Sequence, residues 1–437
     1  MILAREARGF TSDQMLDPLL DSCEFTNAGG EMKELLPKKT QEYQARAREV
    51  AEKFVRPVAA ELDRTREYPW SVVAALRDHE LMGIWVPPEY GGQGAGVLDM
   101  CVVVEELSRA CGGVGVAYAV NGLGSFPIIL GGTEEQKRRW LPAVASGEKL
   151  IAFGLSEKWS GSDAGSMIAR ATPDGDGYVI NGEKKWNTNG GVASLYTIYA
   201  STNPERGTRG ASAFVVEKGT PGFEIGKRED TMGIRCVPVH ELLFKECRVG
   251  ADHLLGGKEG AGFANAMATL DRARPGVAAQ AIGLAQGAFE WAVRYTSERQ
   301  QFGQSVMSFQ ATQFTLADMA IQIEAARQLV YTASRAIDAG LSGVSRLAAM
   351  CKVMATDTAM RVTTDAVQLF GGYGYCADYP IEKYMRDAKI TQIYEGTNQI
   401  QRVVIGRSLT REAKQIAGHL EVKVEHFPEG TGPQKKV

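Results

Sequence analysis

Histidine is scarce in this sequence, with five among 437 residues. No HExxH motif is present, and no histidine lies near a cluster of cysteines, so we expect no metal site. The seven cysteines form no CxxC pair, and their number is odd. This pattern favours reduced thiols, as in a cytosolic protein, over a disulfide framework or a zinc site.

The sequence also lacks a basic excess, because its formal net charge at pH 7 is −3. Proteins that bind nucleic acid usually present a basic face, so that class is disfavoured. The first ten residues, MILAREARGF, lack the apolar core of a signal peptide, and we expect a cytoplasmic protein. The apolar run LDMCVVVEELSRACGGVGVAYAV is interrupted by Glu105, Glu106 and Arg109, so we predict no membrane span.

The chain does contain helical, then strand-like, then again helical segments. Apolar residues recur at three- and four-residue steps in its first and last thirds, which is typical of helices. Between them, short runs rich in β-branched and aromatic residues alternate with turn residues, which predicts an antiparallel sheet. We therefore predict an α+β multidomain protein with an N-terminal extension (1–36), an N-terminal helical domain (37–149), a middle antiparallel β domain (150–256), a C-terminal helical domain (257–412) and a polar tail (413–437).

Single residues mark the expected limits of several elements. Pro57 should bend or end the first helix, and Pro275 should kink a later helix or begin it. Thr133 is a predicted helix N-cap, and residues 175–177 are a predicted hairpin turn. The run GGQGAG (91–96) looks like a dinucleotide loop, but it follows no clear strand, and we predict a turn instead.

One acidic residue is prominent in the segment RDAKITQIYEGTNQIQR (386–402). Glu395 lies between Tyr394 and Gly396, just before an amide-rich stretch. Removal of a proton next to a carbonyl needs a base whose pKa lies near the working pH, and burial raises the pKa of a carboxyl group. Gly396 would let a substrate carbonyl approach the backbone. Taken alone, however, the segment is more typical of a solvated or helix-capping glutamate.

Four further motifs precede this segment in the chain. They are GLSEKWSGSD (154–163), KKWNTNGG (184–191), RQQFGQSVMSFQ (299–310) and QLFGGYGY (368–375). From about residue 37 to about residue 412, the order and spacing of the motifs closely resemble the acyl-CoA dehydrogenase family, in particular its short- and medium-chain branch. The resemblance implies a helical domain, a middle antiparallel β domain and a C-terminal four-helix bundle. It also implies FAD as the cofactor and an acyl-CoA as the substrate.

The resemblance assigns the catalytic chemistry to Glu395. The matching residue of the family removes the α-proton of an acyl-CoA while the β-hydrogen leaves as hydride to flavin N5, which yields a 2-enoyl-CoA. The backbone N–H of the same residue polarises the thioester carbonyl. The implied substrate-binding residues are Ser162, Asp271, Arg274, Tyr394 and Gly396.

The resemblance implies two groups of FAD-binding residues. The first group contacts the flavin ring and consists of Phe153, Leu155, Ser156, Ser162, Trp186 and Thr188. The second group binds the pyrophosphate and adenine end, in part across a subunit contact, and consists of Arg299, Gln301, Phe302, Phe309, Gln310, Gln368, Gly371, Gly372, Thr397, Asn398 and Gln399. The resemblance further implies a homotetramer, built as a dimer of dimers, and an electron-transferring flavoprotein as electron acceptor.

The chain departs from the family pattern at two places. Lys158, Trp159 and Ser160 stand where the family usually has Pro-Gly-Ala, and we expect Trp159 to narrow the substrate entrance, to stack on CoA, or to be an exposed loop residue. Asn187 replaces an aliphatic residue. Because consecutive strand residues face opposite sides, Asn187 should point away from the flavin. Without the resemblance, the Trp186 segment is more typical of a β-domain core and the FGGYG run of a helix end.

Three function classes are compatible with such a chain: a dehydrogenase, a flavin oxidase or monooxygenase on the same fold, and a non-enzymatic assembly protein. The joint presence of Glu395 and the flavin contacts favours the dehydrogenase.

The helix that lines the acyl pocket in the family matches residues 114–128, which contain no Arg or Lys to pair a distal carboxylate. We therefore expect a short- or medium-chain, branched or cyclic acyl group rather than a dicarboxylic one.

Overall fold

The computed structural model describes residues 36–418 of the chain. The chain divides into two compact units, residues 1–42 and residues 43–437. Of the smaller unit, only residues 36–42 are described, and helix α2 (Lys38–Val50) begins there. The predicted extension (1–36) and tail (413–437) therefore lie almost wholly outside the described residues.

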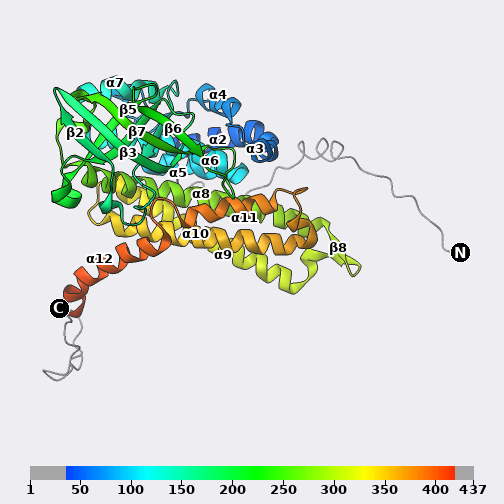
Figure 1. Ribbon diagram of the computed structural model, residues 1–437. Helices are drawn as coiled ribbons and strands as arrows, with labels where there is room; N and C mark the ends of the chain where they lie inside the picture. Colours follow the sequence, from blue (N-terminus) through cyan, green and yellow to red (C-terminus); the bar gives the residue numbers. More distant parts are fainter. Residues whose placement is uncertain (1–35, 419–437) are drawn as a thin grey trace. The chain divides into compact units, whose positions relative to one another are not determined.

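The N-terminal part of the larger unit is helical (Figure 1). After α2, the chain passes through a π-helical turn η2 (Ala51–Val55) and a 3-10 turn η3 (Arg56–Val58) into α3 (Ala59–Thr65). Pro57 lies in this irregular stretch, which confirms the predicted break in the first helix. The remaining elements of this part are α4 (Trp70–Asp78), η4 (Pro88–Tyr90), α5 (Val97–Ala110), α6 (Gly112–Gly131) and α7 (Glu134–Ala145).

Two of the predicted local signals lie in this part. The Thr133 hydroxyl accepts a hydrogen bond from the backbone N–H of Gln136 at 3.3 Å, and Oε1 of Gln136 accepts one from the N–H of Thr133 at 3.0 Å. This capping box confirms the predicted start of α7. Residues 91–96 follow η4 as a turn and irregular chain, with no strand before them, which confirms that GGQGAG is not a dinucleotide loop.

Helix α6 has a property that the sequence did not lead us to predict. Its 20 residues are long and apolar enough to cross a membrane, and 78% of its most apolar window is buried in the protein. It packs against α8, α5 and β1, as a core helix does. The charged residues that interrupt the apolar run of the sequence, Glu105, Glu106 and Arg109, all belong to α5 and not to α6.

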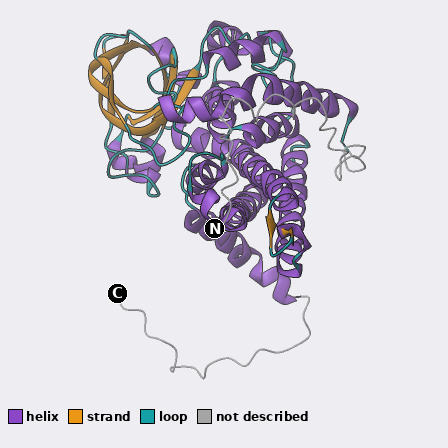
Figure 2. Ribbon diagram, turned by 90° about the vertical axis from the view of Figure 1, so that its right-hand side faces the viewer, coloured by secondary structure: helices purple, strands orange, loops and turns teal. Residues whose placement is uncertain are grey.

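The middle part forms a seven-stranded sheet that curves round in Figure 2. Its strands are β1 (Ile151–Gly154), β2 (Arg170–Asp174), β3 (Gly177–Thr188), β4 (Leu195–Ser201), β5 (Ala211–Glu217), β6 (Phe223–Arg228) and β7 (Val239–Gly250). The strand order is β1-β4-β2-β3-β7-β6, with β5 beside β4. Short turns η5 (Ala164–Ser166), η6 (Pro204–Gly210), η7 (Ala251–His253) and η8 (Leu255–Gly257) connect or follow the strands.

The sheet differs in one respect from the purely antiparallel sheet that we predicted. Most neighbours are antiparallel, and the β2–β3 hairpin turns at residues 175 and 176, as predicted. However, β1 pairs with β4 in parallel, and β2 also pairs with β4 in parallel, at Arg170 and Ser201. A parallel pair needs a connection of a dozen or more residues, and residues 155–194, which contain the β2–β3 hairpin, supply it.

The C-terminal part is a helical bundle. Its elements are α8 (Gly262–Glu298), the small hairpin β8 (Gln300–Gln301) and β9 (Gln304–Ser305), η9 (Val306–Ser308), α9 (Gln310–Asp338), α10 (Val344–Phe370), η10 (Gly371–Tyr375), α11 (Ile381–Lys389), η11 (Ile390–Gln392) and α12 (Asn398–Gly418). Helix α10 packs against α8, α9, α11 and α12. Helix α8 continues through Pro275, so that residue does not begin a helix. The helical, sheet and helical order confirms the predicted fold class.

Candidate active site

Glu395 lies in the short connection between η11 and α12. Glu395 and Gly396 both have left-handed backbone conformations, with φ of 52° and 90°. Such a conformation is unfavourable for a residue with a side chain, and surrounding contacts must hold it. The φ of Gly396 favours glycine, and a Cβ there would also lie 2.5 Å from Nε2 of Gln401, so that side chain would have to move.

Three side chains hold the carbonyl groups of this turn. Nε2 of Gln401 donates to the carbonyl oxygen of Glu395 at 3.2 Å and to that of Gly396 at 3.0 Å. Nε of Arg274 donates to the carbonyl oxygen of Glu395 at 3.5 Å, and Nζ of Lys352 donates to that of Gly396 at 3.0 Å. Because Arg274 lies on α8 and Lys352 on α10, the turn is tied to two helices of the bundle.

The carboxyl group of Glu395 has the properties of a buried base. Its Oε2 is buried and has no hydrogen-bond partner within the described residues. Burial raises the pKa of Glu395 to about 7, although the positive charges of Arg274 and Lys352 act to lower it. A carboxyl group with a pKa near neutral pH and an oxygen that no protein group occupies can accept a proton from a bound molecule.

Other predicted substrate residues lie around this turn. Arg274 forms an ion pair with Asp271 on the same helix, with 2.8 Å between Nη1 and Oδ1. The hydroxyl of Tyr394 donates to Oε1 of Gln280, which anchors the residue before Glu395 to α8. The structure therefore brings Asp271, Arg274, Tyr394 and Gly396 together with Glu395.

Trp186 presents its indole at the surface of the β domain. It is 52% exposed and has a φ of 58°. The register of β3 against β7 shifts between Lys184 and Asn187, so an irregularity in the strand lies at Trp186. Asn187 is 1% exposed, and its Nδ2 donates to the carbonyl oxygen of His240 at 2.9 Å. Trp186 is exposed and Asn187 is buried, so the two side chains do not share a face, and an exposed planar indole fits a stacked flavin ring.

The rest of the predicted flavin-ring group lies beside Trp186, apart from Ser162. The end of β1 and the residues after it, Phe153, Leu155 and Ser156, lie next to β3. The carbonyl oxygen of Ser156 accepts a hydrogen bond from the backbone N–H of Lys185 at 2.9 Å. Thr188 is half-buried at the end of β3. The residues present thus fit a flavin ring laid against this edge of the β domain.

Ser162 lies in an exposed loop that begins with a tight turn. Glu157 and Ser160 exchange two backbone hydrogen bonds, of 3.0 and 3.2 Å, which leaves Lys158 and Trp159 at the tip. Trp159 is 76% exposed, and Nζ of Lys158 lies 5.1 Å from its ring centroid, in a cation–π contact. Trp159 is therefore an exposed loop residue, and a role in binding CoA stays a prediction.

Most of the second predicted FAD group gathers at the far end of α10. The guanidinium of Arg299 lies 5.6 Å from the ring centroid of Tyr373, which joins the β8–β9 hairpin to η10. Gly371, with a φ of 59°, ends α10, so the helix-end interpretation of this run also holds. The members of this cluster are Arg299, Gln301, Phe302, Phe309, Gln310, Gln368, Gly371 and Gly372.

This cluster is remote from Glu395 within one chain. Lys352, which contacts the Glu395 turn, lies about two turns from the start of α10, and Gly371 follows its end. At ~1.5 Å per residue, roughly 28 Å of helix separate them. In Figure 1 the β8 hairpin and the start of α12 lie at opposite ends of α10.

Thr397, Asn398 and Gln399 lie beside the Glu395 turn rather than with that cluster. Asn398 is buried, and its Oδ1 accepts a hydrogen bond from Lys352 at 2.8 Å, while its Nδ2 donates to Asp357 at 2.7 Å. Its amide is thus used within the chain. Lys352 and Gln401, which hold the carbonyl groups of the Glu395–Gly396 turn, were not among the site residues predicted from the sequence. The amide-rich stretch signalled Gln401, whereas Lys352 precedes Gly396 by 44 residues and gave no signal.

Comparisons with known proteins match this arrangement. The chain matches the N-terminal domain of acyl-CoA dehydrogenases over residues 37–148, the middle domain over 152–247 and the C-terminal domain over 260–410. It is 48% identical to the probable acyl-CoA dehydrogenase FadE25 of Mycobacterium tuberculosis, over 86% of this chain and 96% of that protein. It is also 48% identical to a short-chain-specific acyl-CoA dehydrogenase of Clostridium acetobutylicum, over 83% of this chain and 96% of that protein.

A solved structure gives the same result. The butyryl-CoA dehydrogenase of Megasphaera elsdenii is 44% identical and has a TM-score of 0.84, with 86% of this chain and 99% of that chain covered. The domain matches extend over most of the chain, and the residues at Trp186 fit the flavin that this family uses. The chain therefore belongs to the acyl-CoA dehydrogenase family and is an FAD-dependent oxidoreductase.

Proposed function

We propose that Glu395 removes the α-proton of a bound acyl-CoA while the β-hydrogen leaves as hydride. FAD supplies the hydride acceptor, at N5, and the thioester product is a 2-enoyl-CoA. The proton ends on the Glu395 carboxylate, so atoms and electrons balance. The observation that carries this proposal is the buried Oε2 of Glu395, which has no partner within the described residues, in a carboxyl group whose pKa burial raises to about 7.

The site residues fall into two roles under this proposal. Arg274, Gln401 and Lys352 fix the Glu395–Gly396 turn, and the backbone N–H of Glu395 polarises the thioester carbonyl. The residues of the first predicted FAD group beside Trp186 would hold the flavin ring, and the exposed indole of Trp186 would provide a stacking surface for it. Ser162 and Asp271 contribute to binding of the CoA part.

A short acyl chain is the substrate that we favour. Helix α6, which matches the pocket-lining helix of the family, contains no Arg or Lys, so an acyl chain with a distal carboxylate would be buried without a partner. The relatives named short-chain-specific and butyryl-CoA dehydrogenase support the same choice. Medium-length, branched and cyclic acyl groups belong in the same substrate panel.

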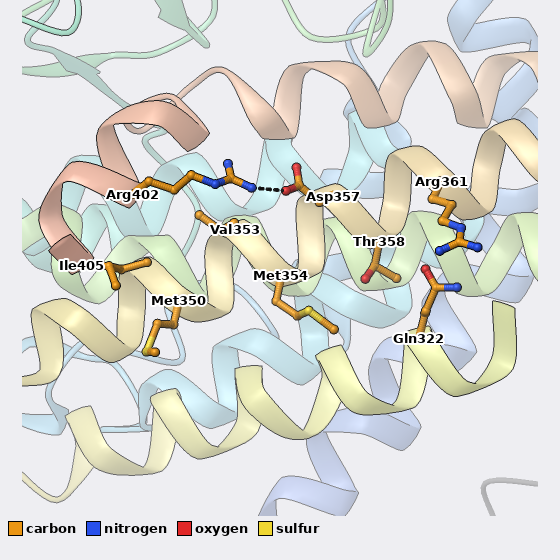
Figure 3. Close-up of a pocket in the computed structure, with 9 residues that line it drawn as sticks. All are labelled: Gln322, Met350, Val353, Met354, Asp357, Thr358, Arg361, Arg402 and Ile405. Carbon is orange, nitrogen blue, oxygen red and sulfur yellow. Dashed lines mark hydrogen bonds and ion pairs between the residues drawn. The ribbon is translucent and has the colours of Figure 1, made fainter. Parts of the chain in front are cut away.

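We also propose a homotetramer, a dimer of dimers. The second FAD cluster, which is predicted to bind the pyrophosphate and adenine end, lies remote from the Glu395 turn within one chain. A second copy of the chain can supply this cluster to an FAD whose ring lies near Glu395. A groove between α9, α10 and α12 supports this assembly (Figure 3). Met350, Met354 and Ile405 line it with apolar surface, and Asp357 pairs with Arg402 across 2.7 Å beside them. A second copy of the chain would cover this apolar surface.

The proposed electron acceptor is an electron-transferring flavoprotein, on the strength of the family resemblance. The cytoplasmic location also stays a prediction. Neither proposal affects the assignment of Glu395, because the acceptor acts after the substrate has been oxidised.

The test is product analysis with a panel of CoA thioesters and an artificial electron acceptor. We expect purified enzyme to convert butyryl-CoA to the 2-enoyl-CoA. Two electrons should reach the artificial acceptor for each molecule of product. Formation of hydrogen peroxide at the full turnover rate without acceptor would identify an oxidase instead. An enzyme that binds FAD but leaves every thioester of the panel unchanged would refute the proposal.

A further inference from the structure

Lys352 is a buried cation with no anionic partner in contact. The residue is 0% exposed on α10, and its Nζ donates to two neutral oxygens, the carbonyl of Gly396 at 3.0 Å and Oδ1 of Asn398 at 2.8 Å. Burial lowers the pKa of Lys352 to about 7. A charge held in the interior without an ion pair is costly, and for that reason the amine is protonated only below about pH 7. Its place beside the Glu395 turn therefore calls for a physical reason.

The other buried lysines of the described residues are arranged differently. Nζ of Lys184 lies 2.7 Å from Oε1 of Glu157, and Nζ of Lys383 lies 2.5 Å from Oδ2 of Asp387. Each of them is neutralised by a carboxylate in direct contact. Lys352 has instead a carboxyl group nearby but not in contact, that of Glu395, whose negative charge raises the pKa of the lysine.

Lys352 acts on the backbone of the Glu395 turn. It shares the carbonyl of Gly396 with Gln401, and it shares Asn398 with Thr356, whose hydroxyl accepts from Nδ2 of Asn398 at 2.8 Å. Lys352 and Thr356 are one turn apart on α10. Helix α10 is thereby hydrogen-bonded to Asn398, the first residue of α12, and to the left-handed turn just before it.

Lys352 also acts on the charge of the Glu395 carboxyl group. The ionisable groups that influence Glu395 are Arg274 from α8 and Lys352 from α10, and both favour its ionised form. Arg274 is partly neutralised by Asp271, and Asp357 acts on Lys352 from the same helix. The lysine therefore offsets the desolvation that a bound acyl chain imposes on Glu395.

We propose that Lys352 is a positioning residue for proton abstraction: it fixes the Glu395–Gly396 turn and supplies the positive charge that keeps Glu395 ionised beneath the substrate. This inference rests on the proposed role of Glu395. It adds a second residue that determines the pH range in which Glu395 is ionised. It also explains why Lys352 is buried without an ion pair.

The test separates proton removal from hydride transfer. An acyl-CoA analogue with sulfur in place of the β-methylene can lose its α-proton but cannot release a β-hydride. Its enolate beside oxidised flavin gives a long-wavelength absorption band, which can be titrated against pH. In Lys352→Met, we expect the midpoint of this titration to move to higher pH by about one pH unit or more, because Glu395 loses an opposite charge.

Two further variants complete the design. Lys352→Gln keeps a hydrogen-bond donor but no charge, so the midpoint of its titration should also rise. Its maximum rate of acyl-CoA oxidation should fall less than that of Lys352→Met, because the hydrogen bonds to the turn are retained. Lys389→Met removes an exposed cation six residues before Glu395 and should leave the midpoint unchanged, since water screens that charge. Circular dichroism and flavin content establish that each variant is folded.

The outcomes distinguish this inference from the proposed function. If the wild-type enzyme gives no band with the analogue and oxidises no thioester, the proposed function fails. If the wild-type enzyme works and both folded Lys352 variants keep its midpoint, the positioning role of Lys352 is refuted while the role of Glu395 stands. A shift in Lys389→Met equal to that in Lys352→Met would also refute it.

Discussion

Lys184 and Glu157 form a buried ion pair inside the β domain, with 2.7 Å between Nζ and Oε1. The same carboxylate accepts hydrogen bonds from the backbone N–H groups of Ile168 at 2.5 Å and Ala169 at 3.0 Å. Nζ of Lys184 also donates to the carbonyl oxygen of Leu155 at 3.2 Å. This ion pair thus holds Leu155 at the start and Ile168 and Ala169 at the end of the loop that carries Trp159 and Ser162.

We predict that Lys184→Met destabilises the protein by about 3–5 kcal/mol, because Glu157 keeps a buried charge that no cation neutralises. Urea unfolding, monitored by circular dichroism, measures the loss. The double variant Lys184→Met/Glu157→Gln should lose less than the single variant, since neither charge is then present. A single variant as stable as the wild type would contradict the structural role of this pair.

Trp186 and Asn187 should respond differently to truncation. Trp186→Ala should lower the affinity for FAD and change the stability of the apoprotein little, because the indole is largely exposed. Asn187→Ala should destabilise the apoprotein by about 1–3 kcal/mol, because it removes the hydrogen bond that the buried Asn187 amide donates to the carbonyl oxygen of His240. Thermal unfolding without FAD and fluorescence titration with FAD separate the two effects. The reverse pattern would mean that Trp186 does not face the flavin.

The stability of the enzyme should carry a signature of the buried Glu395. Its pKa rises from an ordinary 4.5 to about 7 in the folded protein, so between these values the folded state holds a proton that the unfolded state has lost. The stability contributed by this group therefore falls as pH rises through that window. Glu395→Gln has no carboxyl group to ionise in the interior and does not lose stability in this way. The Tm of Glu395→Gln should therefore exceed the wild-type Tm by more at pH 8 than at pH 5. An advantage that does not grow with pH would show that Glu395 has an ordinary pKa.

The groove between α9, α10 and α12 provides a test of assembly. A charge at Met354 should weaken the tetramer, because the second copy would have to bury it against an apolar surface. We expect Met354→Asp to elute as a smaller species in size-exclusion chromatography with light scattering. Met232→Asp, at an exposed apolar residue outside the bundle, is the matched control and should keep the wild-type size. A wild-type monomer with normal FAD binding would refute the assembly itself.

The parts of this site that follow from local pattern were predictable. Capping chemistry sufficed to start α7 at Thr133, and local sequence distinguished Asn187 from the neighbouring Trp186, although the register shift in β3 was not predicted. The five motifs pointed to Glu395 as the predicted base through their resemblance to a family, and the residues beside it belong to the same motif. Each of these inferences depends on residues within a few positions of one another.

Contacts between distant segments were not predictable in the same way. The left-handed turn at Glu395 and Gly396 is held by Arg274, which precedes Glu395 by 121 residues, and by Lys352 on another helix, which contacts the carbonyl oxygen of Gly396. The parallel pairing of β1 with β4 depends on the path of the intervening hairpin. The full apolar length of α6 was not predicted, because the charged residues that were counted against it belong to α5.

The central claim is that Glu395 starts the oxidation of an acyl-CoA by removing its α-proton. Anaerobic stopped-flow mixing of the FAD-loaded enzyme with butyryl-CoA, followed by flavin absorbance, tests it most directly. We predict rapid bleaching in the wild type and a rate at least ~10²–10⁴-fold lower in Glu395→Gln, with equal FAD content, because the amide cannot accept the proton. Bleaching of Glu395→Gln at more than about a tenth of the wild-type rate would show that another group is the base.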